Sequence, residues 1–269
     1  MTAGSLSRSL AAPRSLLRTF LLRIRPAFVA AALKRMLKVE RVVVDTKHGR
    51  FLVDPVSNLG ASLASSGEYE PEMRRTLEKF LGPGRVFVDI GANEGYFSVI
   101  GRKLVGDAGK IVAVEPQSRL LPILQENFRL NAVTGVQLVH GAVSDTPGKA
   151  SLHLSPDTNT GSSSLDQSTS YTLPTEQTEV MTLSELFSRQ GVAGADLVKM
   201  DIEGFEYEAV LGSRELFTAG RIRAFALELH PPRIERRGLK VADITNFLTE
   251  AGYALEPGLG NTVWVRRGS

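Results

Sequence analysis

The sequence predicts an α/β fold built on a doubly wound, mostly parallel β-sheet. The first observation is a series of short, nearly continuous apolar runs from residue 85 onward, typical of parallel strands covered on both faces. The second is that helical segments separate most of these runs, an alternation that forms right-handed βαβ units. The expected strands are residues 85–90, 110–115, 136–143, 196–202 and 222–229.

The end of the chain departs from this pattern and predicts a closing antiparallel hairpin. Two short strand-like runs, residues 253–257 and 262–267, flank a Gly-Leu-Gly-Asn turn, as in a β-hairpin. Together these elements predict a Rossmann-like domain over residues 85–269. The helices expected within it are residues 96–105, 117–131, 182–189, 204–213 and 240–251.

Two further segments precede this domain. Residues 40–54 contain two runs rich in Val, Phe and Leu around the turn-like Lys47-His48-Gly49, which predicts a β-hairpin. Residues 68–81 are expected to form a helix that ends at Gly82-Pro83-Gly84, a helix-stopping sequence. We therefore predict a hairpin-and-helix segment over 40–84, preceded by a basic helical arm over 1–39.

Positive charge is concentrated in this arm. Residues 1–40 carry eight Arg and Lys and a single acid, Glu40, so they sum to +7 in a chain of net charge +3, and the remaining residues sum to −4. Phosphate binding needs a basic stripe on the folded domain, so the chain is not expected to bind nucleic acid.

The arm has an amphipathic pattern that leaves two interpretations open. On a helical wheel, Leu17, Phe20 and Ile24 share one face, with arginines beside it. The arm could lie on an anionic membrane surface or a partner, as basic amphipathic helices do. A helix that caps the domain, or a frayed tail, explains the same pattern.

No segment is expected to cross a membrane. The most apolar N-terminal stretch is interrupted by Arg23, Arg25 and Pro26, whereas spanning needs about 20 mostly apolar residues. The same arginines make a signal peptide a poor fit. The expected location is therefore the cytoplasm, peripheral to the inner face of a membrane if the arm binds lipid. The chain has no cysteine, which excludes disulfides and thiolate metal sites.

Residues 155–177 interrupt the regular pattern of strands and helices. They are dominated by Ser and Thr and show no periodicity. A loop of this length in a compact domain is usually functional or disordered. A lid over a substrate and a surface loop without a role both fit the sequence.

The turn after the first expected strand of the domain indicates the kind of cofactor. Asp89, Gly91 and Gly95 give a strand end, a tight glycine turn and a helix start. A dinucleotide-binding turn would need further glycines where this chain has Asn93 and Tyr96, so the pyrophosphate site is degraded. Acidic residues beside the turn repel phosphate but suit an ammonium and a sulfonium. S-adenosylmethionine carries both and has no phosphate.

The next two strand ends extend this cofactor site. Glu115 ends the second strand, where an acid can accept hydrogen bonds from ribose hydroxyls; a merely solvated strand-end acid is the alternative. The third strand is expected to end in residues 141–145. There the backbone of Ala142 and the carboxylate of Asp145 would frame the adenine, although the same residues also read as a simple turn.

Four ionisable side chains are expected to converge beyond the fourth and fifth strands. Asp201 and Glu203 are two residues apart, as are Glu228 and His230, so each pair faces one way in an extended chain. Asp201 would contact the methionyl end of the cofactor or orient the acceptor. Glu203, Glu228 and His230 would handle the hydroxyl proton.

Plainer interpretations of these four residues remain open. Asp201 could simply cap the following helix, and His230 could hold a turn before the two prolines. A divalent metal on these oxygens and the imidazole is chemically possible. No spacing here is specific to a metal site, so a metal is not favoured.

At these residues the sequence resembles the FkbM family of methyltransferases. The resemblance covers about residues 65–255 and rests on VFVDIGANEGYFS at 86–98, VAVEP at 112–116 and LVKMDIEGFEYEAVLG at 197–212. Tyr69-Glu70 and TGSSSL at 160–165 add support. The DIEGxE stretch is the most specific motif, because many methyltransferases share the glycine turn.

The resemblance implies a class I methyltransferase fold, S-adenosylmethionine as donor, and O-methylation of a hydroxyl on a small molecule, sugar or glycan. Carried over by position, Asp201 and Glu203 mark the catalytic edge. Tyr69, Glu70 and Ser163 are expected on the acceptor side. The implied cofactor-binding residues are Asp89, Gly91, Asn93, Gly95 and Glu115.

Three other functions were weighed. The missing glycines argue against a nicotinamide-dependent oxidoreductase. A nucleic-acid N-methyltransferase would show an Asn/Asp-Pro-Pro-aromatic motif where this chain has Asp201-Ile202-Glu203-Gly204. A non-catalytic cofactor-binding or membrane-surface module remains the alternative function. The sequence leaves the acceptor and the oligomeric state open.

Overall fold

The computed structural model describes residues 36, 39–155, 163–165, 175–259 and 263–268. The basic arm expected over residues 1–39 and most of the Ser/Thr-rich stretch over 155–177 therefore lie outside the described residues. Within those residues, no helix is both long enough and apolar enough to cross a membrane.

The core of the fold is a seven-stranded sheet of order β11-β12-β10-β9-β3-β4-β5. The five strands from β10 to β5 in this order are parallel, and β12 runs antiparallel to both of its neighbours. This confirms the doubly wound α/β prediction and the closing antiparallel hairpin. The strands are β3 (Val86–Ile90), β4 (Lys110–Glu115), β5 (Val136–His140), β9 (Ala195–Met200), β10 (Ile222–Leu227), β11 (Tyr253–Leu255) and β12 (Val263–Arg266).

The strand order reverses between β3 and β9. From β3 the chain proceeds to β4 and β5 on one side, and from β9 to β10 on the other. At this reversal the backbone N–H of Asp201 donates to the carbonyl of Ile90 at 3.1 Å. Open α/β sheets bind ligands at such a switch point, outside the carboxyl ends of the strands, and Gly91 and Asp201 lie there.

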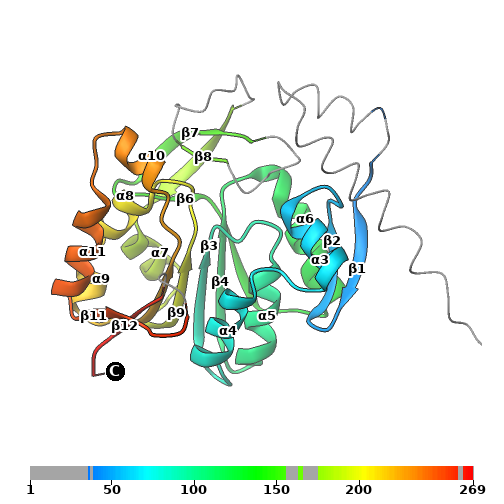
Figure 1. Ribbon diagram of the computed structural model, residues 1–269, viewed down its shortest axis with the longest axis horizontal. Helices are drawn as coiled ribbons and strands as arrows, with labels where there is room; N and C mark the ends of the chain where they lie inside the picture. The colour runs from blue at the N-terminus through cyan, green and yellow to red at the C-terminus, as the bar shows by residue number, and fades with distance from the viewer. Residues whose placement is uncertain (1–35, 37–38, 156–162, 166–174, 260–262, 269) are drawn as a thin grey trace, which may run out of the picture.

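Each strand contributes apolar side chains to both faces of the sheet. Phe87 packs with helices on one face, and its neighbour Val88 packs with helices on the other. This two-sided burial explains why the strands are nearly continuous apolar runs. Figure 1 shows the two helical layers: α4 (Pro71–Phe80), α5 (Tyr96–Val105) and α6 (Leu121–Leu130) on one side, and α7 (Leu183–Arg189), α8 (Glu206–Leu211), α9 (Arg214–Thr218) and α11 (Val241–Glu250) on the other.

Sequence reasoning missed two short helices near the site. The first, α3 (Asn58–Ser66), has few large side chains, but the Ser57 hydroxyl caps it by accepting from the Gly60 N–H at 3.0 Å. The second, α10 (Pro231–Arg236), begins with the two prolines that follow His230. Proline is tolerated in the first helical turn, where the missing N–H has no partner to lose.

The expected strand 136–143 proves to be two strands in different sheets. β5 ends at His140, and β6 (Ala142–Val143) pairs instead with β8 (Thr175–Met181), which also pairs with β7 (Gly148–His153). The prediction of one strand was wrong, because an apolar run does not reveal where the backbone changes its hydrogen-bonding partner. The last residues of the expected 155–177 loop belong to β8.

The expected N-terminal hairpin is confirmed by the antiparallel pairing of β1 (Val42–Thr46) with β2 (Gly49–Val53). It shares its core with α4 and α5, because Phe51 and Val53 are fully buried in the same apolar cluster. Asn127 of α6 anchors the hairpin. Its side chain accepts from the Leu52 N–H at 2.6 Å and donates to the Leu52 carbonyl at 3.3 Å and the Glu94 carbonyl at 2.8 Å.

Replacing Asn127 by Ala is expected to lower the free energy of unfolding by about 2–4 kcal/mol. The side chain is fully buried, and its loss strands buried backbone groups at roughly 1–3 kcal/mol each. Asn131→Ala is the matched control. Asn131 makes the same kind of pair with Arg50 near solvent, where water can replace it. Urea unfolding of both variants measures the difference, and equal losses would contradict the role of burial.

Candidate active site

Three cavities meet at the carboxyl ends of β3, β4, β9 and β10. The Glu115 cavity lies between the glycine turn, the end of β4 and residues 141–143. The Tyr96 cavity lies on the other side of the turn, against α3, Tyr69 and Glu70. The α4 groove runs from Glu70 along α4 to the ends of β9 and β10. Asp201 lines all three.

The glycine turn is shaped by a close backbone contact with Asp201. Gly91 has φ 81°, and a Cβ there would lie 1.9 Å from the Asp201 carbonyl oxygen. The neighbouring loop therefore occupies the space that a side chain at position 91 would need. Asn93 has φ 52° and faces both the Glu115 and Tyr96 cavities.

Asp89 and Gly95 support the conformation of the turn, but neither is among the described residues that line the three cavities. The Asp89 carboxylate is 1% exposed and accepts from the Ser98 hydroxyl at 2.6 Å. A Cβ on Gly95 would lie 3.0 Å from Leu124 of α6, so glycine at this position lets α6 pack closely against the turn.

Glu115 lies in the wall of the cavity named after it. Its carboxylate is 2% exposed and accepts the backbone N–H groups of Asn93 at 2.8 Å and Gln117 at 3.0 Å. Burial raises the pKa of Glu115 to about 7, although these backbone hydrogen bonds oppose the rise. The carboxylate is therefore held in one orientation, with hydrogen-bonding capacity left for a ligand.

Ala142 lines the Glu115 cavity, but Asp145 does not. Asp145 is exposed and accepts from the Ser144 hydroxyl at 3.3 Å. The prediction that Asp145 frames the adenine stays a prediction, and the geometry does not favour it, because β6 leaves the main sheet and carries Asp145 toward Gly212 at the end of α8. Ser163, expected on the acceptor side, lines the Glu115 cavity and donates to Gln117 at 2.9 Å.

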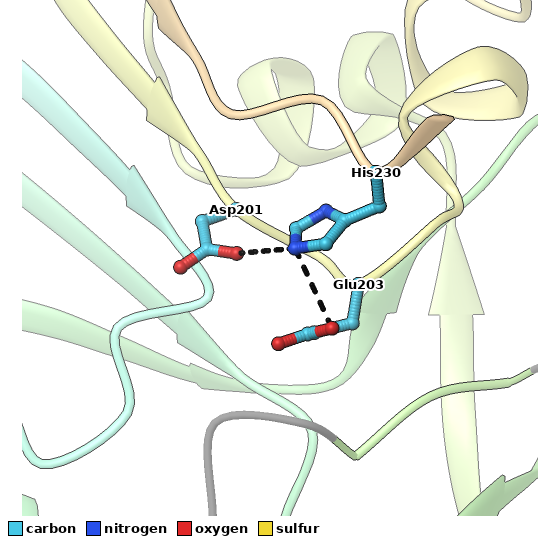
Figure 2. Close-up of side chains that lie close together, drawn as sticks. All are labelled: Asp201, Glu203 and His230. Carbon is cyan, nitrogen blue, oxygen red and sulfur yellow. Dashed lines mark ion pairs between the residues drawn. The ribbon is translucent and has the colours of Figure 1, made fainter. Parts of the chain in front are cut away.

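Figure 2 shows that Asp201 and Glu203, from the loop after β9, lie close to His230, from the loop after β10. The His230 Nε2 lies 3.9 Å from Asp201 and 3.4 Å from Glu203, and its Nδ1 lies 2.8 Å from the fully buried Glu206. Burial acts to lower the pKa of His230, but the hydrogen bond and charge of Glu206, together with the charges of Glu203 and Asp201, outweigh it and raise the pKa to about 9.

A pKa of about 9 favours the protonated form of His230 at neutral pH. The prediction that His230 handles the hydroxyl proton stays a prediction, and this pKa disfavours a role as the base, because a protonated imidazole cannot take a proton from a hydroxyl. Burial also raises the pKa of Glu203 to about 7, and Arg233 pairs with Glu203 at 3.0 Å. Neither Glu203 nor His230 is among the described residues that line the α4 groove.

The family model described as "Methyltransferase FkbM domain" matches residues 89–255, more than half of the chain. The chain belongs to the FkbM family of methyltransferases. S-adenosylmethionine is its methyl donor. A second family model, protein-L-isoaspartate(D-aspartate) O-methyltransferase, matches residues 26–146. No curated protein matches the chain.

Solved methyltransferase structures resemble this FkbM chain at low identity. The FkbM methyltransferase from Methylobacillus flagellatus KT is 14% identical, with 80% of this chain and 62% of that protein covered and a TM-score of 0.43. Precorrin-6y C5,15-methyltransferase from Geobacter metallireducens GS-15 is 18% identical, with 69% of this chain and 73% of that protein covered and a TM-score of 0.40. Aeropyrum pernix fibrillarin with bound S-adenosyl-L-methionine is 12% identical, with 68% of this chain and 66% of that protein covered and a TM-score of 0.37. Likeness at this level identifies no acceptor.

The cluster in this FkbM chain could also hold a divalent ion. One ligand atom from each of Asp201, Glu203 and His230 lies within 4.8 Å of the others, a spacing that a coordinated metal can bridge. The protein supplies positive charge at the same place, through Arg233 and the protonated His230. Charge balance in the cluster therefore does not depend on a metal.

Sequence reasoning gave no role to Lys199 or Glu206, although both lie in the stretch at 197–212 that carries the family resemblance. Lys199 is 6% exposed; its Nζ donates to the Gly91 carbonyl at 3.1 Å and lies 3.8 Å from both Asp89 and Asp201. Burial acts against its charge, but Asp201 and the acids around it outweigh burial and raise the pKa of Lys199. A lysine within the otherwise apolar run of β9 was the available signal, because buried charges are rare unless paired.

Proposed function

We propose that this chain is an S-adenosylmethionine-dependent O-methyltransferase whose acceptor is a hydroxyl of a small molecule or carbohydrate. The observation that carries the proposal is the position of Asp201 at the meeting point of all three cavities. Methyl transfer needs donor and acceptor aligned at one point, and a residue that faces both can hold that geometry.

The two cavities beside the glycine turn suit the two ends of the donor. In the Glu115 cavity, Glu115 would accept the ribose hydroxyls, and Ala142 with its neighbours would contact the adenine. The Tyr96 cavity, on the other side of the turn, would hold the methionyl end. These assignments support a donor bound across the turn, with its sulfonium near Asp201.

The α4 groove suits a neutral, hydroxylated acceptor. Its volume of about 720 Å³ lies within the roughly 300–1,000 Å³ of small-molecule sites. Its wall combines apolar side chains such as Met73 and Leu229 with the carboxylates of Glu70, Glu72 and Glu228. Carboxylates accept hydrogen bonds from hydroxyls, and their charge disfavours phosphate or carboxylate acceptors.

The remaining polar residues have supporting roles in this proposal. Glu228 would hydrogen-bond the acceptor from the groove, and burial, with Asp201 and Glu70 nearby, raises its pKa. Glu203 and His230 would act as positioning residues, because they contact Asp201 and the loop that carries it. Asp201 itself would orient the transferring methyl and the attacking oxygen.

Calorimetry and methyl transfer test the proposal together. Titration with S-adenosylmethionine, S-adenosylhomocysteine and NADH, with and without magnesium, should show binding of the two adenosyl ligands and none of NADH. Tritiated donor is then supplied with methyl glycosides, inositol, catechols, an isoaspartyl peptide and transfer RNA. Label on the peptide or the RNA alone would overturn the hydroxyl acceptor. Binding without transfer to any compound would favour a non-catalytic cofactor-binding module.

The affinity for S-adenosylhomocysteine is expected to rise about tenfold between pH 6 and pH 8. Ribose hydroxyls would donate to the ionised Glu115 carboxylate, whose pKa is about 7. Below pH 7, Glu115 must lose a proton before it can accept these hydrogen bonds. The ionised fraction of Glu115 rises from roughly a tenth at pH 6 to roughly nine tenths at pH 8, which gives the tenfold change in affinity. Calorimetry at both pH values measures it.

Glu115→Gln is expected to bind more weakly and to lose this pH dependence. Glu203→Gln is the matched control, because Glu203 lines the same cavity and also has a pKa of about 7. It should keep the wild-type slope. If the pH dependence of the affinity instead disappeared in Glu203→Gln and persisted in Glu115→Gln, the group that titrates on binding would be Glu203 rather than Glu115.

A further inference from the structure

Three residues separate the Tyr96 cavity from the α4 groove. Glu70, Lys199 and Asp201 are the described residues that line both. In the proposed function the methionyl end of the donor occupies the cavity and the acceptor occupies the groove. A side chain shared by the two walls therefore stands beside the methyl group in transfer.

Glu70 is held at this boundary by an unusual backbone conformation. It has φ 41° and ψ 71°, in the left-handed region, and it directly precedes Pro71, the first residue of α4. A non-glycine residue in this region carries strain, which occurs preferentially at functional sites. A Glu at the N-cap could hydrogen-bond the first turn of its helix, but within the described residues the Glu70 side chain makes no such bond.

The other two boundary residues are already engaged with the protein. Lys199 donates to the Gly91 carbonyl and pairs with Asp89 and Asp201. Asp201 in turn has Lys199 and His230 beside it. Glu70 is hydrogen-bonded by the Tyr69 hydroxyl, which leaves lone pairs on its carboxylate for a proton.

The charges around Glu70 favour proton uptake. Burial is the largest effect and raises the pKa of Glu70; Asp201 and Asp89 act in the same direction, while Tyr69 and Lys199 oppose it. Glu228 faces it across the groove. A base with a raised pKa is closer to the working pH, where general-base catalysis is most effective.

We propose that Glu70 is the catalytic base that accepts the proton of the acceptor hydroxyl. This inference rests on the proposed O-methyl transfer. The acceptor O–H bond breaks and its proton passes to a Glu70 carboxylate oxygen. The oxygen forms a bond to the methyl carbon, the carbon–sulfur bond breaks, and its electron pair stays on sulfur, which becomes the neutral thioether of S-adenosylhomocysteine. Glu228 lies on the groove alone and would bind the acceptor without reaching the methyl group.

Glu70→Gln tests the proposal, with Glu78→Gln as the matched control. Glu78 is an exposed acid of the same helix, α4, and is not among the described residues that line the three cavities. With the acceptor that wild-type protein methylates best among methyl glycosides, inositol and catechols, Glu70→Gln should lower kcat about 10²-fold. It should also remove the rise of kcat with pH that the wild type shows. Glu70→Asp should restore part of the rate, and Glu78→Gln should behave as wild type.

A second readout needs no acceptor. S-adenosylmethionine carries a sulfonium charge that S-adenosylhomocysteine lacks, so a carboxylate beside the sulfur favours the former. At pH 8, Glu70→Gln should lower the ratio of the two affinities about tenfold, while affinity for S-adenosylhomocysteine reports an intact fold.

An unchanged affinity ratio in Glu70→Gln would overturn the placement of Glu70 beside the methyl group. A Glu70→Gln enzyme with wild-type kcat and pH profile would overturn its role as base. Failure of the wild type to methylate any hydroxyl would instead count against the proposed function.

Discussion

Replacing Asp201 by Asn is expected to reduce methyl transfer at least ~10³-fold while S-adenosylhomocysteine affinity changes only a few-fold. The substitution keeps the shape of the side chain but removes the charge where the three cavities meet. Loss of orientation costs about 10²-fold, and loss of a preorganised charge near the reacting atoms adds roughly 10²–10³-fold. Single-turnover kinetics with tritiated donor measures the chemical step directly.

Asp145→Asn is the matched control for this variant. It makes the same chemical change at a carboxylate that lies outside the Glu115 cavity, so binding and transfer should both stay at wild-type levels. If Asp201→Asn lost donor affinity in proportion to its rate, Asp201 would belong to the donor site alone. A large effect of Asp145→Asn would support the contact between Asp145 and the adenine that the sequence predicted.

Gly91→Ala is expected to destabilise the protein by about 2–5 kcal/mol and to weaken donor binding at least ~100-fold. Two penalties add at this position. A side chain at φ 81° costs roughly 1–2 kcal/mol, and a Cβ placed 1.9 Å from the Asp201 carbonyl oxygen forces the two strand-end loops apart, at about 1–3 kcal/mol. Because Gly91 and Asp201 line the same cavities, the displacement should damage both the fold and the site.

Gly84→Ala separates these two penalties. Gly84 has φ 79°, nearly that of Gly91, but a Cβ there meets no atom within 4 Å. Gly84→Ala should lose only the stability that depends on backbone conformation, and it should bind the donor with normal affinity. Urea unfolding and calorimetry on both variants give the comparison. Equal destabilisation of the two would mean that backbone conformation, rather than contact with Asp201, requires glycine at position 91.

The central part of the fold could be predicted because its signals are local. β4 and α5 have the expected bounds, and α11 differs by one residue at each end, since burial on both faces gives apolar runs and helix periodicity gives the intervening segments. α3, α9 and α10 were missed because short helices depend on capping and on neighbours. The change of sheet after His140 was missed because β6 is defined by its partner β8, and the paired residues are 38 apart along the chain.

The candidate site divides in the same way. The sequence identified the strand ends that hold ligands, so Gly91, Asn93, Glu115, Ala142 and Asp201 all line cavities there. It gave no means of separating Glu228, which faces the α4 groove, from His230, which does not. The two are only two residues apart in the chain, but at the start of α10 the His230 side chain turns toward the buried Glu206.

The sequence by itself determined the α/β architecture, the family and the methyl donor, because strand burial, the glycine turn and the DIEGxE stretch are local patterns. Only the tertiary structure decided the roles of single polar residues. A protonated His230, a buried Lys199 between Asp89 and Asp201, and a strained Glu70 between two cavities all depend on charges brought together from distant segments. Coulombic interaction and desolvation act through space, so residue type and spacing along the chain do not fix them.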